Sequence, residues 1–338
     1  MTRLSLGAFT AATAEADGVR PVNLHSDLRP LADLIELAFA NSMDSAGRSA
    51  IREMRYLSHM GAALRLITRI NSLAEGISLG FVYMDAGELV GNVSIYPANF
   101  PRELGETWLL ANVAVHPRQR RRGIAHQLVA SSLEALRSRG AARVILQVDC
   151  ANEAALKLYE AQGFIYERAW RHWRRSSRVR APVPPGHDFH ITRLRRNERA
   201  AEFALAQAAR PNSRGGLGWL KPLRKADFYL SPWRQVRKWL SMNSIEKLII
   251  RNADAREILA SCWLENAMSF GRVQARLFTS PQIDHRAYAE ALISNLVSRY
   301  ERTTILVEHP RDDDVVSELL RRQQFKVRRE LWHMRLEF

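Results

Sequence analysis

The 338-residue sequence contains little cysteine and no long hydrophobic run. Its two cysteines, Cys150 and Cys262, are too few for a disulfide framework or a metal-ligand cluster, so we expect reduced thiols and no bound metal. No stretch approaches the roughly 18 uninterrupted apolar residues of a membrane-spanning helix. Polar residues interrupt the Ala/Thr-rich residues 1–18, which are interpreted as a flexible leader. The sequence therefore predicts a cytoplasmic protein that does not insert into a membrane.

Acidic residues are also in the minority, with 35 against 50 basic residues and a net charge of +15. The imbalance is concentrated in residues 176–338, which carry +11 of this charge. A basic surface attracts phosphorylated cofactors, nucleic acid and anionic lipid alike. Because arginine supplies 44 of the 50 basic residues, a general preference for arginine in the composition contributes to the excess of positive charge. The charge alone does not choose among these partners.

The chain contains a repeat on either side of a Pro/Arg-rich stretch, Arg174–Gly186. Val113–Phe164 aligns without a gap on Gln274–Phe325, at an offset of 161. Proline and arginine interrupt the periodic pattern between the repeats, which indicates a linker. We therefore expect a leader at 1–18, a first domain at 19–175, a linker at 176–188 and a second domain at 189–338.

The spacing of apolar residues predicts a mixed α/β fold for the first domain, and the second domain follows the same pattern. The expected strands are 19–24, 79–84, 88–96, 108–115, 143–149 and 165–173. The expected helices are 30–40, 46–70, 124–137 and 152–162. The fold class is accordingly α/β (α+β) in tandem.

A basic loop joins the strand that ends at Val115 to the helix that begins near Gly123. The first N–H groups of a helix lack intrahelical partners and lie at the positive end of its dipole. Glycine allows phosphate oxygens to approach the backbone closely. Nearby arginines add charge-assisted donors, namely Arg118, Arg120, Arg121 and Arg122. The loop suits a pyrophosphate, although the same spacing also fits a solvated basic turn.

Three groups of residues around this loop resemble the GCN5-related N-acetyltransferase (GNAT) superfamily. They are Val113-Ala-Val-His-Pro, Arg120-x-x-Gly123-x-Ala125, and Asn152-x-x-Ala-x-x-Leu-Tyr159-x-x-x-Gly-Phe164. The Arg-x-x-Gly-x-Ala motif is weak alone and becomes specific with the third group at this distance. The resemblance covers most of the first domain.

The resemblance implies domains built on a mixed, mostly antiparallel sheet flanked by helices, with acetyl-CoA bound to the first. Backbone amides of the loop would bind the pyrophosphate, and the end of the preceding strand would face the pantetheine arm and thioester. Asn152 would contact the cofactor and Tyr159 would lie near the sulfur. The implied cofactor-binding residues are Val113, Ala114, Val115, Arg118, Arg120, Arg121, Arg122, Gly123, Ile124, Ala125, Asn152 and Tyr159.

Tyr159 is the candidate catalytic residue. Amine attack on a thioester builds negative charge on the carbonyl oxygen, which a strand N–H stabilises. The departing thiolate can accept a proton from a phenol, which is protonated at neutral pH. With Ala155 and Leu158, Tyr159 also lies on an apolar helix face, so packing is the alternative role. Many family members carry a glutamate as base on the strand that ends at Val115, but this strand contains no acid, and the base stays unassigned.

The second domain departs from the family pattern at the cofactor positions. At the offset of 161, Gly123 becomes Asp284, Asn152 becomes Asp313 and Tyr159 becomes Leu320. An aspartate at the phosphate-binding turn would repel a pyrophosphate. We therefore expect a second domain that keeps the fold and lacks the cofactor, a division of labour similar to that of tandem GNAT proteins such as the mycothiol synthases.

One segment, Trp219–Leu240, combines aromatic and basic residues in a way that suits single-stranded nucleic acid. Trp233, Val236 and Leu240 share one helical face, so an amphipathic helix is favoured over a nucleic-acid site. The sequence thus predicts direct acetyl transfer from acetyl-CoA to a primary amine of an unidentified acceptor. The rival is a non-catalytic acyl-CoA sensor or a basic RNA- or ribosome-associated protein. Oligomeric state is not predicted.

Overall fold

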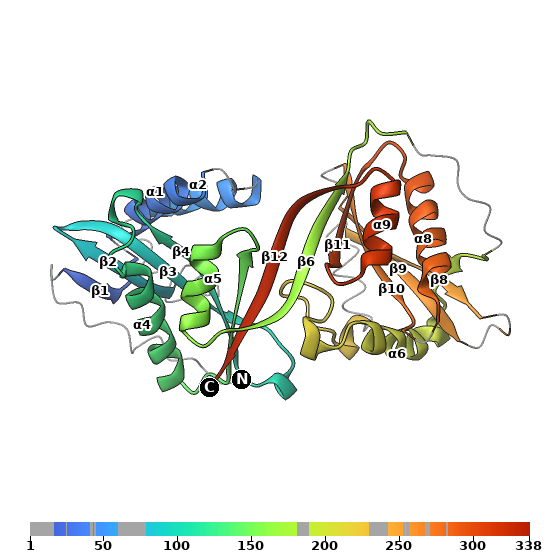
Figure 1. Ribbon diagram of the computed structural model, residues 1–338, viewed down its shortest axis with the longest axis horizontal. Coiled ribbons are helices and arrows are strands. Elements are labelled where there is room, and N and C mark those ends of the chain that lie inside the picture. Colours follow the sequence, from blue (N-terminus) through green and yellow to red (C-terminus); the bar gives the residue numbers. More distant parts are fainter. Residues whose placement is uncertain are drawn as a thin grey trace. The chain divides into compact units, whose positions relative to one another are not determined.

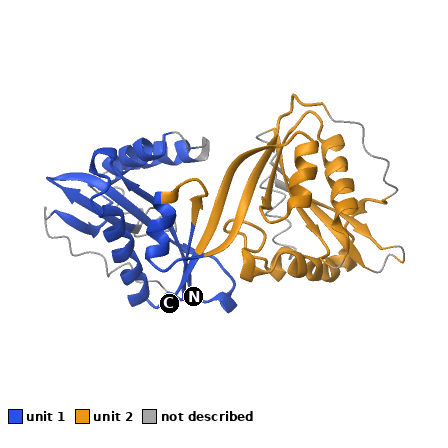
Figure 2. Ribbon diagram, in the orientation of Figure 1, with its two compact units in different colours: residues 1–146, 154–165, 335–338 blue, residues 147–153, 166–334 orange. Residues whose placement is uncertain are grey.

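The structure is a computed structural model. It describes residues 17–24, 26–40, 43, 45–59, 79–180, 189–229, 243–252, 254, 257–267, 271–281 and 283–338. The chain divides into two compact units, shown in different colours in Figure 2. Unit 1 comprises Met1–Leu146, Ala154–Ile165 and Arg335–Phe338, and unit 2 comprises Gln147–Glu153 and Tyr166–Met334.

Unit 1 is built on a sheet whose strands follow the order β1-β2-β3-β4-β5. Neighbouring strands are antiparallel except for β4 and β5, which are parallel. Figure 1 shows α1 and α2 on one side of this sheet and α4 on the other. The strands are β1 (Gly18–Pro21), β2 (Leu79–Asp85), β3 (Glu88–Ala98), β4 (Thr107–Val115) and β5 (Arg143–Asp149), and the helices are α1 (Leu28–Phe39), α2 (Ser45–Ser58), α4 (Ile124–Ser138) and α5 (Glu153–Ala161).

Helix α4 packs closely on β3, and this contact fixes the position of the helix start. A Cβ added to Gly91 would lie 2.8 Å from Ile124 Cγ2 and 2.9 Å from Leu128 Cδ1. Ile124, Leu128 and Leu136 are almost completely buried, as expected for the apolar stripe of an amphipathic helix. The first turn of α4 is therefore held against the sheet by its own buried residues.

Unit 2 is built on strands in the order β12-β6-β11-β10-β9-β8-β7. Helices α8 and α9 pack on one face with Trp173 and Val307, and α6 packs with Trp263 and Phe278. The strands are β6 (Ile165–Arg175), β7 (Thr192–Arg193), β8 (Asn243–Arg251), β9 (Ile258–Ala267), β10 (Arg272–Thr279), β11 (Thr304–Pro310) and β12 (Lys326–Glu337). The helices are α6 (Arg199–Ala209), α8 (His285–Arg299) and α9 (Asp314–Arg322).

Short 3-10 helices occur in both units. They lie at Arg102–Leu104, Pro117–Gln119, Arg196–Glu198, Asn212–Arg214 and Lys225–Asp227.

The structure confirms the fold class and the repeat. Helices α4 and α8, strands β5 and β11, and helices α5 and α9 each begin and end 161 residues apart. Gly163 and Gln324, which follow the two shorter helices at this offset, both have left-handed backbones, with φ of 88° and 61°. The repeat thus extends to the conformation of single residues, even where a non-glycine residue carries the strain.

The last strand of the first repeat pairs within unit 2. β6 is antiparallel to β11, from Ile305 opposite Arg175 to Pro310 opposite Trp170. Unit 1, in turn, contains the last residues of β12: Phe338 N–H donates to Ala142 O at 3.1 Å, and Arg143 pairs with Glu337 at 3.0 Å. The predicted boundaries at 175 and 189 remain predictions.

The elements expected in the first half are confirmed within a few residues at their ends. The helical region 46–70 is α2 as far as Ser58, and residues 60–78 lie outside the described residues. In Trp219–Leu240, the described part to Tyr229 contains turns and one 3-10 helix, Lys225–Asp227. Trp233, Val236 and Leu240 lie outside the described residues.

Candidate functional site

The end of β4 separates from β5 at the place where the acyl chain is expected. β4 pairs with β5 only from Thr107 to Leu109. On its other edge, the register with β3 shifts between Asn92 and Ser94, so that Asn112 and Val113 have no partner residue there. Asn112 has a left-handed backbone with φ of 50°, which marks a β-bulge. The main chain of β4 beyond Leu109 is thus available to a ligand on the β5 side.

A buried asparagine supports this bulge. Asn92 is completely buried, and its Nδ2 donates to Asn112 O at 2.8 Å. Both asparagine side chains also lie 3.3 Å from Ser94 Oγ. Because a buried amide of this kind holds an irregular backbone in one conformation, Asn92 is part of the site that sequence reasoning missed. Nothing in the pattern of β3 distinguishes it from an ordinary strand residue.

The loop before α4 has the backbone conformation of an anion site. Arg121 and Gly123 have φ of 66° and 76°, so left-handed residues occur just before the helix begins at Ile124. No side chain caps the first turn of α4. Gly123 is exposed, and the nearest atom to a Cβ placed there is Gln127 Nε2 at 3.9 Å. The open N–H groups can therefore receive phosphate oxygens.

The four arginines of the loop differ in their contacts. Arg122 pairs with Asp85 at 2.7 and 3.2 Å and also contacts Gln119. The Arg122 guanidinium lowers the pKa of the Asp85 carboxyl through this hydrogen bond. Arg120 Nε donates to Val115 O at 3.4 Å. Arg122 is thus tied to the β2–β3 turn, a partner that the sequence did not reveal.

Arg118 and Arg121 are exposed, and among the described residues neither side chain has an ion-pair partner. They are therefore the two arginines of the loop best able to turn toward a phosphate. The roles of all four arginines remain predictions.

Tyr159 lies within α5, whereas Asn152 precedes this helix. Tyr159 is in the second turn and is buried, with its ring edge-on to Phe164 at 5.8 Å between centroids. Burial raises the pKa of the Tyr159 phenol, so the hydroxyl keeps its proton across the neutral range. Asn152 stands immediately before the helix and is exposed. Packing and proton donation are both compatible with this geometry of Tyr159, and its catalytic role remains a prediction.

The corresponding helix start in the second repeat is closed by a side chain. Asp284 precedes α8 and its Oδ1 accepts from Arg286 N–H at 3.1 Å. The carboxylate thus uses an N–H of the kind that a phosphate would need and places a negative charge beside it. Arg286, at the position of Ala125, pairs with Glu318 at 2.6 Å.

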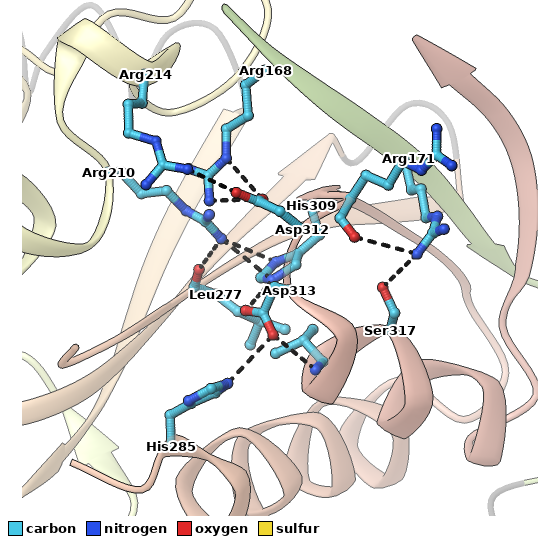
Figure 3. Close-up of polar contacts among 12 residues, drawn as sticks. Arg168, Arg171, Arg210, Arg214, Leu277, His285, His309, Asp312, Asp313 and Ser317 are labelled. Carbon is cyan, nitrogen blue, oxygen red and sulfur yellow. Dashed lines mark hydrogen bonds and ion pairs between the residues drawn. The ribbon is translucent and has the colours of Figure 1, made fainter. Parts of the chain in front are cut away.

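The second repeat also fills the position of Asn152 with an internal polar network, drawn in Figure 3. Asp313 caps α9 by accepting from Val316 N–H at 3.0 Å, and it contacts His309 and His285 at 2.8 and 3.3 Å. On the other side of the buried His309 ring, Arg210 lies 3.1 Å from Nδ1. Burial lowers the pKa of His309 to about 4, so the ring is neutral, accepts from Arg210 and donates to Asp313.

Comparisons with known proteins concern the family and the fold. Residues 50–164 match the family model described as the acetyltransferase (GNAT) family. The first half of the chain carries a GNAT domain. A tandem GNAT protein from the clavulanic acid biosynthesis pathway has a similar fold, with a TM-score of 0.52 and 12% identity over 94% of this chain and 98% of its own.

Two curated relatives match part of the chain. N-alpha-acetyltransferase 30 of Schizosaccharomyces pombe is 33% identical over 94 residues, which are 28% of this chain and 62% of the relative. Mycothiol acetyltransferase of Thermobispora bispora is 39% identical over 88 residues, 25% of this chain and 29% of the relative. The chain thus spans less than two thirds of either relative.

Searches for other kinds of site give two observations. Within the described ranges, no three histidine, cysteine or acidic side chains are grouped so that they could hold a metal ion. No helix in the part of the chain that the structure describes is long and apolar enough to span a membrane.

Proposed function

We propose that this chain is a GNAT-type acyltransferase that transfers an acetyl group from acetyl-CoA to a primary amine. The single observation that carries the proposal is the uncapped start of α4, where Arg121 and Gly123 are left-handed and the first N–H groups are open. The capped start of α8 supplies the contrast within one chain. The first repeat binds the cofactor under this proposal, and the second does not.

The proposed transfer is direct and uses main-chain groups and one phenol. The edge of β4 that faces β5, unpaired beyond Leu109, provides N–H groups for the oxyanion of the tetrahedral intermediate. When the intermediate collapses, the C–S bond breaks and Tyr159 gives its proton to the coenzyme A sulfur. The amine gains the acetyl group and releases a proton. Cys150 is not the nucleophile, because burial raises the pKa of its thiol.

The acceptor is a primary amine whose remaining structure we leave open. The two curated relatives bear names that refer to different acceptors, and each matches only part of the chain. The basic second half, with +11, disfavours polycationic acceptors such as spermidine in comparison with singly charged amines. A protein N-terminus and a small amino compound both meet this description.

The test is release of coenzyme A thiol by the full chain in the presence of acetyl-CoA. The acceptor panel holds a polyamine, an aminoglycoside, amino acids and peptides with free N-termini. Thiol release that depends on one of these amines, together with an acetylated product in mass spectrometry, is the expected result. Binding of acetyl-CoA without transfer to any of them would favour the acyl-CoA sensor. Copurified nucleic acid and no affinity for acetyl-CoA would favour the RNA-associated alternative.

A further inference from the structure

A second polar cluster lies in unit 2, away from the loop of α4 in sequence. Gln147, His172, Glu308 and His333 come from β5, β6, β11 and β12, four strands that are neighbours in the sheet. At the offset of 161, Gln147 corresponds to Glu308 and His172 to His333. The cluster is thus built from the same two positions of each repeat, and all four residues belong to unit 2.

The register places these groups on one face of the sheet. Glu308 is directly opposite His172 in the antiparallel pair of β6 and β11. Side chains in such positions lie side by side on the same face. Their chain neighbours Trp173 and Val307 pack toward α8 and α9, so Glu308 and His172 are on the opposite face. Trp170, two residues before His172, shares that face and stacks on His333 with ring centroids 5.5 Å apart.

Glu308 is a buried carboxylate with few partners. It is 7% exposed, and Trp219 N–H donates to its Oε1 at 2.9 Å. A Cβ on Gly218 would lie within 2.9 Å of the Glu308 carboxyl atoms, so only glycine lets the chain close over them. An ionised carboxylate has about four acceptor positions, and burying one with most of them empty costs free energy.

Arg276 and Lys221 pair with Glu265, although Lys221 and Arg210 also interact electrostatically with Glu308. Arg276, on β10 beside β11, pairs with Glu265 through both terminal nitrogens. Lys221 Nζ lies 3.8 Å from Glu265. Among the described residues no side chain forms an ion pair with Glu308. Within the described residues, Glu308 therefore accepts from Trp219 N–H at Oε1 and forms no ion pair, which leaves Oε2 for a further donor.

The imidazoles complete a site that favours a cation over an anion. His172 Nε2 is buried and has no partner in the described part of the chain. Burial lowers the pKa of both His172 and His333. Gln147 Nε2 donates to His333 Nε2 at 3.0 Å. Because Nε2 accepts this hydrogen bond, it is the nitrogen of the neutral His333 ring that carries no proton. Gln147, His172, Trp219 and Lys221 are all half-buried, so solvent reaches the cluster from their side.

We propose that Glu308 and His172 bind the ammonium group of a primary amine, with Glu308 supplying the charge and His172 a second acceptor. The main-chain N–H of Trp219 hydrogen-bonds to the Glu308 carboxylate, and the Trp219 ring packs against the rest of the ligand. The site lies within unit 2 alone. The negative charge of the Glu308 carboxylate disfavours an anion. A neutral analogue of the amine lacks the positive charge that interacts with Glu308, so it should bind more weakly.

The test measures binding of benzylamine to the full chain by nuclear magnetic resonance, in the absence of acetyl-CoA. Benzyl alcohol, which has the same ring and no charge, is the ligand control. Glu308→Gln keeps the acceptor for Trp219 N–H and removes the charge. Glu330→Gln is the matched control, because Glu330 pairs with Arg171 on β6. The expected result is millimolar binding of benzylamine that weakens about 10–100-fold in Glu308→Gln and is unchanged in Glu330→Gln.

Equal affinity of Glu308→Gln and the wild type, no binding of benzylamine, or equal binding of benzyl alcohol would overturn the proposal. His172→Phe adds an independent arm, since it preserves the ring volume and removes the acceptor, and it should weaken benzylamine binding as well. If benzylamine binds through Glu308 but acetyl-CoA does not bind, the site stands and the acetyltransferase proposal fails. If acetyl transfer occurs and benzylamine does not bind, the acetyltransferase proposal stands and this site fails.

Discussion

The substitution Gly123→Asp gives the start of α4 the residue that precedes α8, although φ is 76° at Gly123 and −63° at Asp284. Asp284 shows what a carboxylate does at this position, because it accepts from a helix N–H at 3.1 Å. In Gly123→Asp the new carboxylate would compete with the pyrophosphate for the same N–H groups and repel it. Two charge-assisted hydrogen bonds lost at about 1.5–3 kcal/mol each amount to about 3–6 kcal/mol, or about 10²–10⁴-fold in the acetyl-CoA Kd.

The same substitution should leave the fold nearly intact. Gly123 has φ of 76°, and aspartate tolerates this conformation at a cost of about 1–2 kcal/mol. Capping by the new side chain offsets about 1 kcal/mol. Apart from the chain neighbours, Gln127 Nε2 is the only described atom within 4 Å of the added Cβ. We expect the Tm to fall by no more than about 2–4 °C.

The matched control is Gly140→Asp, at the other end of the same helix. Gly140 has φ of 81°, and no atom lies within 4 Å of a Cβ placed there. The two variants therefore carry the same added charge and similar backbone strain. Calorimetry should show lost acetyl-CoA affinity for Gly123→Asp and wild-type affinity for Gly140→Asp. Unchanged affinity in Gly123→Asp would refute the phosphate-loop assignment, and equal losses in both variants would point to a general effect on α4.

Two further predictions concern the phenol and the buried histidines. Tyr159→Phe should lower kcat about 10–10²-fold. The acetyl-CoA KM should be unchanged, because the proton is transferred only as the thioester collapses. A variant with the wild-type kcat would remove Tyr159 from the mechanism. Burial holds the pKa of His309 at about 4 and that of His333 at about 3, whereas an unfolded histidine takes up its proton near 6.5. The unfolded state then binds more protons below that pH, so the free energy of unfolding should fall by up to about 1.4 kcal/mol per pH unit per histidine from about pH 6.5 to 4 in urea titrations. A rise over this interval would contradict the buried neutral rings.

Much of the fold could be predicted from the sequence because the signals are local. Periodic apolar residues located β5 and α4, and the offset of 161 aligned them with β11 and α8. The prediction that the second repeat does not bind phosphate likewise rests on one residue, Asp284, since a carboxylate repels phosphate in any conformation. The structure adds the mechanism, in which the side chain occupies a helix N–H.

The parts that sequence reasoning missed depend on which strands pair. Alternation of apolar residues predicts that β6 is a strand but not that it pairs with β11. The alternation shows only which face of the strand is buried, whereas pairing depends on main-chain hydrogen bonds. Glu308 and His172 are therefore brought together by a register that no local pattern specifies. The coincidence of Gln147 with Glu308 and of His172 with His333 at the offset of 161 was the available signal. Arg122 and Asp85 are likewise joined only when the β2–β3 turn meets the loop.

Strand pairing also changes how the two repeats can be tested. A fragment that ends at Arg175 would keep β6 without its partner β11 and would lose Glu337 and Phe338, which contact Arg143 and Ala142 in unit 1. An unpaired strand exposes a row of hydrogen-bonding groups and promotes aggregation. Substitutions in the full chain are therefore the better means of assigning function to each repeat.

The central claim is that one repeat binds acetyl-CoA and the other does not. Isothermal titration of the full chain with acetyl-CoA tests this claim most directly, because it counts sites without requiring an acceptor. The account predicts a single site per chain, abolished by Gly123→Asp and retained in Asp284→Asn. Two sites per chain, or a single site that survives Gly123→Asp, would contradict it.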